Sequence, residues 1–373
     1  NRNSGSVPSM ENSFYKIELG RGGLKSIYDK ELKKELIDAA KFTAGEVFTM
    51  QSFGNGAGEF DKIQQPSMEG FGQAGDHPAK WEPGESGDVF SAWTRRSELP
   101  YAVVEQKIIL HHGIKRIDFE ISLLNWEGVL FREFRMALPL KMDEGQVAYE
   151  VPFGVVEVGK DEMEGAAGER YQVPAKDLHP RGIENWIGAS DDSFGVTLSS
   201  SVAVADYYDP TDNPVSTVIL QPVLLASRMS CHSEGNQYLQ TGNHYFSFSF
   251  NSHQSGWING YKTGRQANEA LYVVVNPKPY ANAGLPEEKS FFSLDGEDII
   301  ISTIKKAEDD QSVIVRMFEI KGESRTINLN HDFTFNNAIS TNLIEEEIKE
   351  IQLKKNQTNI RIGHHAIETV KLK

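Results

Sequence analysis

The sequence predicts an all-β protein, with two stacked sheets as the simplest arrangement. Long segments alternate apolar and polar residues with a period of two, which places alternate side chains on opposite faces of a strand. Clusters of glycine, proline, aspartate and asparagine separate these segments, as is typical of turns between strands. Convincing helical spacing is scarce in the 373 residues. Together these observations favour sheet-on-sheet packing.

The first predicted element is a hairpin near the start of the chain. Residues 14–19 (FYKIEL) alternate as a half-buried strand does, and residues 24–28 (LKSIY) run back beside them. Residues 20–23 (GRGG) lie between the two strands, and their glycines can take the positive φ angles of a tight reversal. They lack the spacing of a phosphate-binding loop, so we interpret them as a turn.

Longer predicted strands follow. Residues 101–110 (YAVVEQKIIL) and 114–124 (IKRIDFEISLL) alternate throughout, and each spans roughly 30 Å at about 3.3 Å per residue, which implies a broad sheet. Residues 54–87 are rich in glycine and proline without a steady period, and this predicts a long loop. The other strands predicted in this part of the chain are residues 130–140, 148–158, 194–200, 217–225 and 245–251.

A second domain is predicted near the C-terminus. Residues 276–289 (NPKPYANAGLPEEK) contain three prolines and lose the apolar alternation, as a linker does. We therefore expect a first domain at residues 1–280 and a small β-sandwich at residues 281–373. The short strands expected in the second domain are residues 299–304, 313–320, 325–329, 338–343, 348–353, 359–362 and 367–372.

Composition excludes several classes of partner. The net charge is -15, from 38 basic and 53 acidic residues, which argues against a nucleic-acid partner because such binding needs a basic surface. A neutral or sugar-like partner fits this charge better. No apolar run approaches the roughly 20 residues of a membrane span, so we expect no membrane partner.

Cysteine content and the first residue bear on the compartment. The single cysteine, Cys231, excludes an internal disulfide framework but does not decide where the protein resides. The chain begins with Asn1 rather than methionine, so we expect a processed fragment whose export signal lay upstream. A periplasmic or secreted location is therefore slightly favoured over a cytoplasmic one.

The ten histidines do not form a metal-binding pattern. Residues 111–112 and 364–365 are adjacent histidine pairs on or beside predicted strands, where neighbouring side chains point to opposite faces and cannot bind one ion together. Neither a His-Glu-x-x-His nor a His-x-Asp pair occurs in the sequence. We predict no metal ligand, no cofactor and no catalytic residue in this chain.

Residues 177–198 (DLHPRGIENWIGASDDSFGVTL) contain the candidate substrate-binding residues. His179, Glu184, Asn185 and Trp186 combine an aromatic ring, an amide and a carboxylate, which suit the apolar face and the hydroxyl groups of a sugar. The alternative is structural, with Trp186 filling the interior of the sandwich and Asn185 capping a turn. Glu184 with Asp191 or Asp192 is the carboxylate pair to test for glycosidic acid-base catalysis, which needs roughly 5 to 9 Å between the two groups.

Several segments in order resemble one known family. They include residues 11–38 (ENSFYKIELGRGGLKSIYDKELKKELID), 116–128 (RIDFEISLLNWEG), 149–157 (YEVPFGVVE) and 243–257 (NHYFSFSFNSHQSGW). Residues 184–198 and 291–323 extend the likeness to the C-terminal part of the chain. This order of segments resembles the C-terminal β region of glycoside hydrolase family 38, the α-mannosidase family.

The resemblance implies a galactose-mutarotase-like super-sandwich followed by a small C-terminal β-sandwich. It implies that catalysis belongs to an N-terminal α/β domain, in which two histidines and two aspartates hold zinc and an aspartate attacks the anomeric carbon with retention. None of that domain precedes Glu11, so we expect this chain alone to be inactive. The implied partners are carbohydrate (mannosides) and the missing catalytic domain.

Within such an enzyme this chain would be mainly structural and would add residues to the rim of the sugar pocket. An exposed apolar patch is expected where the catalytic domain would pack. Residues 243–257 depart from the family pattern, because they have serine and asparagine where alanine and proline are usual. The substrate preference is therefore not carried over.

Two other functions remain open. A self-sufficient aldose epimerase or polysaccharide lyase on the same fold would use a general acid and a general base, with His179, His244 and Glu184 as candidates. A stand-alone carbohydrate-binding module would use Trp81, Trp186 or Trp257.

Overall fold

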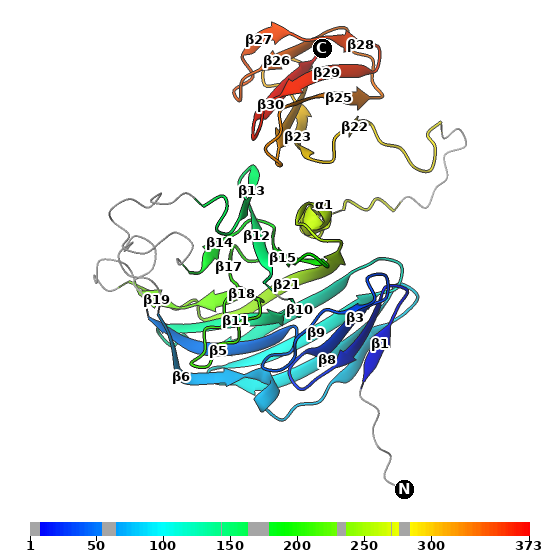
Figure 1. Cartoon of the computed structure of the whole chain (residues 1–373). Coiled ribbons are helices and arrows are strands. Elements are labelled where there is room, and N and C mark those ends of the chain that lie inside the picture. Colours follow the sequence, from blue (N-terminus) through cyan, green and yellow to red (C-terminus); the bar gives the residue numbers. More distant parts are fainter. Residues whose placement is uncertain are drawn as a thin grey trace. The chain divides into compact units, whose positions relative to one another are not determined.

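The computed structural model confirms the all-β class. The described residues form strands β1 to β30, one α-helix, α1 (Ile258–Gln266), and one short 3-10 helix, η1 (Ala74–Asp76) (Figure 1). The structure describes residues 8–53, 65–142, 144–162, 179–229, 236–269, 271–275 and 284–373.

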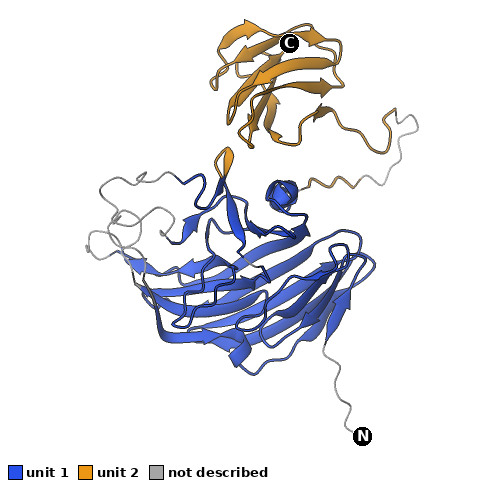
Figure 2. Cartoon of the chain, viewed as in Figure 1, with its two compact units in different colours: residues 1–150, 156–270 blue, residues 151–155, 271–373 orange. Residues whose placement is uncertain are grey.

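The chain divides into two compact units (Figure 2). The first unit contains Asn1–Glu150 and Val156–Ala270, and the second contains Val151–Val155 and Leu271–Lys373. The predicted boundary between residues 280 and 281 stays a prediction, because residues 276–283 lie outside the described part of the chain.

The predicted N-terminal hairpin is present. Strand β2 (Tyr15–Leu19) pairs antiparallel with β3 (Leu24–Asp29), and β1 (Ser9–Glu11) and β4 (Lys34–Glu35) complete a four-stranded sheet. A Cβ atom at Gly23 would lie 2.3 Å from the carbonyl oxygen of Ala44, so only glycine lets the turn lie this close to the following segment.

The first unit also contains two large sheets, apart from residues 151, 154 and 155 of the nine-stranded sheet, which belong to the second unit. In the nine-stranded sheet, inward positions such as Phe119 of β10 are buried while Glu120 beside it is exposed, which is the alternation the sequence predicts. Its strands in spatial order are β13 (Gly154–Glu157), β12 (Gln146–Val151), β15 (Trp186–Ser190), β16 (Gly195–Ser200), β21 (Gly242–His253), β10 (Ile117–Trp126), β9 (Ala102–His111), β8 (Phe90–Leu99) and β7 (Glu82–Ser86).

The six-stranded sheet is buried more evenly. All eight residues of its strand β11 are buried, including three charged ones, so both faces of this strand are covered. Its strands in spatial order are β14 (Arg181–Gly182), β17 (Val204–Asp206), β18 (Ile219–Ala226), β11 (Arg132–Pro139), β5 (Glu46–Phe53) and β6 (Gln65–Gln73). A two-stranded sheet joins β19 (Arg228–Met229) to β20 (Gln237–Tyr238).

The predicted long loop over residues 54–87 is wrong for two of its described segments. Residues 65–73 form β6, which pairs with β5, and residues 82–86 form β7, which pairs with β8. Glycine and proline weaken the local strand signal here, and the partner strands supply the missing stabilisation. Gly70 has a φ of 61°, an angle that a residue with a Cβ atom rarely adopts.

The second unit contains two small sheets, as predicted for a β-sandwich. Buried side chains from both sheets, including Val315, Ile327 and Leu372, form one hydrophobic core. The four-stranded sheet contains β22 (Phe292–Leu294), β25 (Arg325–His331), β29 (Gln357–Ile362) and β28 (Leu353–Lys354). The five-stranded sheet contains β23 (Ile299–Lys306), β24 (Val313–Glu319), β30 (Ile367–Leu372), β26 (Ala338–Thr341) and β27 (Glu347–Glu350).

Helix α1 packs against the nine-stranded sheet through glycines. A Cβ atom at Gly260 would lie 2.0 Å from Oγ1 of Thr197 and 2.2 Å from Nε2 of His253. A Cβ atom at Gly264 would lie 2.7 Å from the Trp186 ring. The missing Cβ atoms therefore allow the helix backbone to approach β15 and β16 closely.

Gly260→Ala is expected to destabilise the first unit by about 1–3 kcal/mol, because the added methyl group overpacks this contact. In an exposed helix the same change would raise the free energy of unfolding by about 1 kcal/mol. The sign of the measured change therefore distinguishes a closely packed helix from an exposed one. Urea unfolding followed by tryptophan fluorescence measures the effect. Gly182→Ala is the control, because nothing lies within 4 Å of its added Cβ. An increase in stability for Gly260→Ala would contradict this packing.

Candidate functional site

His179 forms a dyad with a buried carboxylate. Its Nδ1 lies 2.7 Å from Oδ1 of Asp206 on β17, and its ring makes edge contacts with Tyr207 and Tyr208 at centroid distances of 5.0 and 4.6 Å. Burial opposes ionisation of Asp206, but the His179 hydrogen bond and the charge of Arg135 outweigh it and hold the pKa of Asp206 well below its usual range.

The dyad continues into a buried chain of charges. Arg135 on β11 donates from Nη1 to Asp206 at 2.9 Å and to Gln221 at 3.0 Å, and from Nε to Glu133. Arg228 on β19 donates to the second oxygen of Glu133. Burial raises the pKa of Glu133, but the two arginines outweigh this effect, so the net shift is downward and the carboxylate stays ionised.

Sequence reasoning found His179 but missed its partners. The signal was present in residues 132–135 (REFR), where charges interrupt a strand that is otherwise apolar. A charge in such a strand marks either an exposed face or a buried ion pair. The sequence does not distinguish these cases, because the oppositely charged Asp206 lies 71 residues further along the chain.

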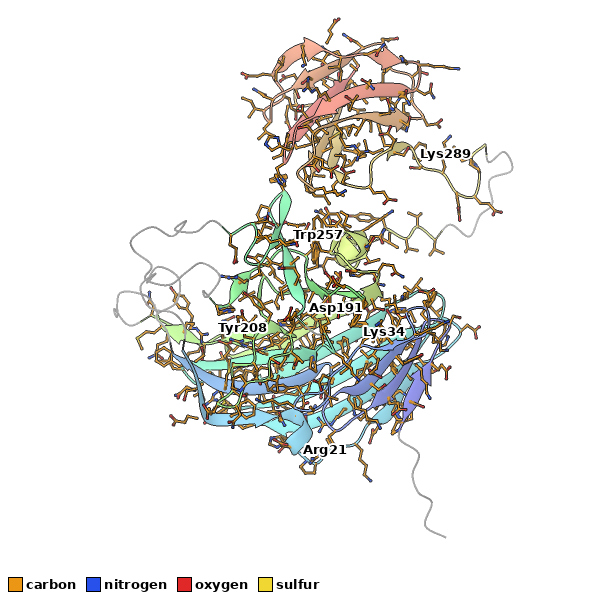
Figure 3. The ribbon with its side chains drawn as sticks, viewed as in Figure 1. Arg21, Lys34, Asp191, Tyr208, Trp257 and Lys289 are labelled. Carbon is orange, nitrogen blue, oxygen red and sulfur yellow. The ribbon has the colours of Figure 1, made fainter. Side chains whose placement is uncertain are left out.

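Among the described residues, the Asp206 contact leaves one ring nitrogen of His179 without a hydrogen bond. The Asp206 contact occupies Nδ1 of His179 and thereby fixes the imidazole orientation, while its Nε2 has no hydrogen-bond partner within the part of the chain that the structure describes. Tyr208, labelled in Figure 3, is more than half exposed beside it. Pro180 and Arg228 line a cavity of about 410 Å³ nearby. Nε2 of His179 is itself enclosed, and neither His179 nor Tyr208 is among the residues that line this cavity.

Glu184 and Asn185 lie in another environment. Their backbone N–H groups donate to the carbonyl oxygen and to Oε2 of Glu150, at 2.9 and 3.2 Å. Arg265 of α1 donates to Oε1 of Glu150 at 2.6 Å, and Asn268 donates to the carbonyl oxygen of Asn185 at 3.0 Å. Burial raises the pKa of Glu150. The exposed Glu184 side chain thus extends from a backbone anchored to the helix.

Trp186 is a core residue, and the prediction that it stacks on a sugar is wrong for this structure. Its side chain is fully buried and packs edge-on against Tyr261, at 6.2 Å between ring centroids. An enclosed ring offers no free face to a ligand. The structural alternative for this tryptophan therefore holds, and it explains why Gly264 must be small.

The four predicted substrate-binding residues do not form one cluster. Glu184, Asn185 and Trp186 lead into β15 of the nine-stranded sheet, whereas His179 contacts β17 of the six-stranded sheet. His244 lies on β21 and its Nε2 is 2.6 Å from the carbonyl oxygen of Gln240. The epimerase and lyase alternatives, which need paired acid and base groups, stay predictions.

Glu184 cannot form an acid-base pair with Asp191 or Asp192. Strand β15 separates them: its four residue steps at about 3.3 Å place Trp186 and Ser190 roughly 13 Å apart, and Glu184 and Asp191 lie beyond these two ends. Glycosidic pairs lie within about 10 Å of each other, so this prediction is wrong. Asp191, labelled in Figure 3, instead accepts hydrogen bonds from the Ser193 and Phe194 backbone at 2.7 and 2.9 Å.

Trp257 lines a polar groove of about 360 Å³ together with Asp191, Asp192 and Lys160. An indole beside carboxylates is an arrangement that suits sugars. Trp81, in contrast, is half-buried and donates from its indole nitrogen to the carbonyl oxygen of Gly20 at 2.8 Å. The carbohydrate-binding alternative stays a prediction, with Trp257 as its best-placed residue.

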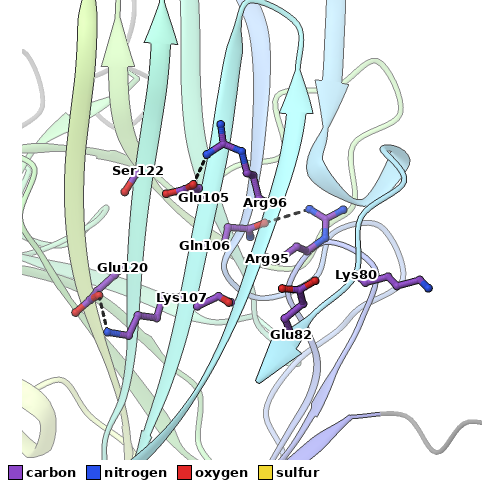
Figure 4. Close-up of a pocket in the computed structure, with 10 residues that line it drawn as sticks. Lys80, Glu82, Arg95, Arg96, Glu105, Gln106, Lys107, Glu120 and Ser122 are labelled. Atoms are coloured by element: carbon purple, nitrogen blue, oxygen red, sulfur yellow. Dashed lines mark hydrogen bonds and ion pairs between the residues drawn. The ribbon is translucent and has the colours of Figure 1, made fainter. Parts of the chain in front are cut away.

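A further groove of about 620 Å³ lies over β7 to β10 (Figure 4). Four of its exposed charges form two pairs: Arg96 binds Glu105, and Lys107 lies 3.4 Å from Glu120. Paired surface charges of this kind contribute little energy and carry no unusual reactivity. We assign no catalytic role to this groove.

The described residues contain no group of three or more histidine, cysteine, aspartate or glutamate side chains that could hold a metal ion. The zinc implied by the resemblance therefore does not fit this part of the chain. No helix in the described ranges is long and apolar enough to cross a membrane.

Two family models match the chain. Residues 10–203 match the glycosyl hydrolases family 38 C-terminal domain, and residues 298–370 match the C-terminal beta sandwich domain of the same family. The chain is 25% identical over 271 residues to alpha-mannosidase G of Dictyostelium discoideum, covering 71% of this chain and 23% of that protein.

Two solved structures from Enterococcus faecalis share the fold. One is a protein in glycosyl hydrolase family 38, at a TM-score of 0.72 and 13% identity, covering 100% of this chain and 45% of that chain. The other is an alpha-mannosidase from strain V583, at a TM-score of 0.73 and 13% identity, covering 98% of this chain and 42% of that chain. This chain therefore spans less than half the length of these relatives.

The topology and these likenesses confirm the predicted all-β class, with large sheets in the first unit followed by a small β-sandwich, and the galactose-mutarotase-like form of the first part stays a prediction. The match over residues 10–203 alone covers more than half of the chain, and the second match follows it in the expected order. The chain belongs to glycosyl hydrolase family 38 and corresponds to the C-terminal β region of that family.

Proposed function

We propose that this chain is the mainly structural C-terminal region of a retaining α-mannoside hydrolase. The catalytic aspartate and the zinc site belong, in this proposal, to a separate N-terminal α/β domain, which is the partner of this chain. The ordered match to both C-terminal domain models of family 38 carries the proposal. The length of the relatives supports it, because the chain covers only 23% of the Dictyostelium discoideum protein.

The geometry of the described residues is consistent with a supporting role. Glu184 and Asp191 are too far apart to act on one glycosidic bond. Much of the ionic chemistry is instead buried and mutually satisfied, as in the pairs of Glu133 with Arg135 and Arg228. Such groups hold a fold in one arrangement.

His179, Glu184 and Asn185 are proposed as rim residues that contact the mannoside. Each belongs to a segment held by hydrogen bonds. The Glu184 side chain is exposed and Asn185 is half-buried, whereas Nε2 of the part-buried His179 ring is enclosed and must be uncovered before it can bind a sugar. A fixed polar group loses little conformational entropy when it binds a sugar hydroxyl. Trp186 is excluded from this set because its ring is enclosed.

Hydrolysis of an aryl α-mannoside tests the main proposal. The chain alone is expected to give no turnover above buffer and to bind no zinc, whereas a longer protein that includes the N-terminal α/β domain is expected to do both. Both proteins are assayed with and without added zinc, and bound metal is measured after gel filtration. Hydrolysis by the chain alone would reject the proposal.

The rim contribution is measured in the longer protein as a second arm of this experiment. Glu184→Ala is expected to raise KM about threefold or more while the melting temperature of the protein is unchanged. His179→Ala is expected to raise KM similarly but also to lower the melting temperature, because it removes a hydrogen bond from the buried Asp206 carboxylate. Glu120→Ala is the control, because this exposed carboxylate lies on β10 in the groove of paired charges. Unchanged KM values would leave this chain with a structural role only.

A further inference from the structure

Residues 271–275 (LYVVV) form an exposed apolar run. Their exposed fractions are 91, 98, 80, 87 and 82% in chain order, although no residue among the five is polar. They belong to no strand, and no backbone hydrogen bond within the described part of the chain pairs them with a sheet. Exposure on this scale is unfavourable in water, so the run indicates a partner surface.

The composition of the run predicts which kind of structure buries it. Tyrosine and valine favour strands, and consecutive strand residues point to opposite faces. A half-buried strand alternates, as β2 does, but this run is apolar at every position and therefore needs cover on both faces. Continuous apolar strands of this kind are typical of sheets covered by helices on both sides.

The described edge strands of this chain do not provide that place, because none with a described burial pattern in the large or small sheets is buried at all of its positions. Strand β11 is covered on both faces, but β5 and β18 already pair with its two edges. The edge strand β27 is exposed at all four positions, so pairing there would leave one or both faces of the run in water. Pro277 and Pro279 follow the run and lack backbone N–H groups, which limits the strand to about these five residues.

We infer that residues 271–275 become a β-strand in a sheet of the N-terminal α/β domain. This inference rests on the proposed function, which supplies an α/β domain as the partner. An α/β sheet has helices on both faces and so covers both faces of an added strand. Backbone hydrogen bonds to the neighbouring strand would give affinity, and the five side chains would enter the two helix-covered layers.

Amide hydrogen exchange tests the inference directly. It is measured on this chain alone and on the longer protein with the α/β domain, or on the co-purified pair if the domain is a separate polypeptide. The amides of residues 272–275 are expected to exchange at least about 100-fold more slowly in the assembly than in the chain alone. Equal exchange rates in the two samples would overturn the inference.

Two substitutions separate strand pairing from simple hydrophobic contact. Val274→Asp places a charge in the run, and Val274→Pro keeps an apolar side chain but removes one backbone donor. If the α/β domain is a separate polypeptide, both substitutions are expected to lower its affinity for this chain by about 10-fold or more. If the two belong to one chain, both are expected to lower the exchange protection of the run by a similar factor. Both leave the melting temperature of this chain alone unchanged, because Val274 is exposed. If the amides of the run stay protected in both variants, the inference that residues 271–275 form a paired strand is wrong.

Ile344→Asp is the matched control. Ile344 is 75% exposed in the second unit and lies outside the run, so its substitution is expected to change neither protection nor affinity. Mannoside hydrolysis by the unchanged longer protein is recorded in the same samples. Hydrolysis without protection rejects the inference and keeps the proposed function. Slow amide exchange without mannoside hydrolysis supports the strand and rejects the proposed substrate.

Discussion

Replacing Glu133 with alanine is expected to destabilise the first unit by about 3–5 kcal/mol. The Glu133 carboxylate is fully buried and binds Arg135 through one oxygen and Arg228 through the other. Its removal leaves two buried guanidinium groups without this countercharge, although Arg135 keeps its bond to Asp206 at 2.9 Å. The cost of an uncompensated buried charge exceeds that of a cavity of the same size.

Urea unfolding followed by tryptophan fluorescence is the appropriate measurement. All five tryptophans lie between residues 81 and 257, so the signal reports the first unit alone. Glu120→Ala is the control, because Glu120 forms an exposed pair with Lys107 and is expected to cost at most about 1 kcal/mol. Equal losses for the two variants would show that the buried pairs do not stabilise this unit.

Acidification from pH 6.5 to 4 is expected to remove about 3 kcal/mol of stability through His253. Burial lowers the pKa of His253 to about 4, against the weaker raising effect of its bond to the Gln254 carbonyl, and the charge of Lys115 lowers it further. In the folded state the ring stays neutral, with Nε2 2.9 Å from the Thr197 hydroxyl.

The sign follows from proton binding. Between pH 6.5 and 4 the unfolded chain binds a proton at this histidine and the folded chain does not, so stability rises with pH across this window and is lost as pH falls. Urea unfolding at several pH values measures the loss in the unchanged chain and in His253→Gln. The variant is expected to lose less stability in this window.

His244→Gln is the control for the pH experiment, because His244 lies toward the exposed end of β21 and should leave the pH dependence intact. Asp206 contributes in a lower range: its pKa is lowered, so its contribution is lost only below the unfolded value near 4. Identical pH curves for the unchanged chain and His253→Gln would contradict the assignment to His253.

Local patterns predicted much of the fold. The period of two identified the hairpin at residues 14–28 and the long strands at residues 101–110 and 114–124, because alternation reflects one covered and one wet face. The same reasoning identified the small sandwich of the second unit. It failed for residues 65–86, where glycine and proline mask strands that exist through pairing with distant partners.

The candidate site was less predictable than the fold. The sequence identified His179 and Glu184 as polar residues near an aromatic one, but residue types do not show which side chains are enclosed. Trp186 proved to be buried beneath α1, and Asp206 proved to be the partner of His179. Both facts depend on contacts between segments that are far apart in the chain.

The all-β class, the small C-terminal sandwich and the family could be predicted from the order of the amino acids, because local periodicity and ordered motifs depend only on neighbouring residues. Only the tertiary structure decided that Glu133 and Asp206 share Arg135, that Glu184 and Asp191 are separated by a strand, and that residues 271–275 remain in water. The physical reason is that burial and charge pairing are properties of long-range packing, which a linear pattern does not encode.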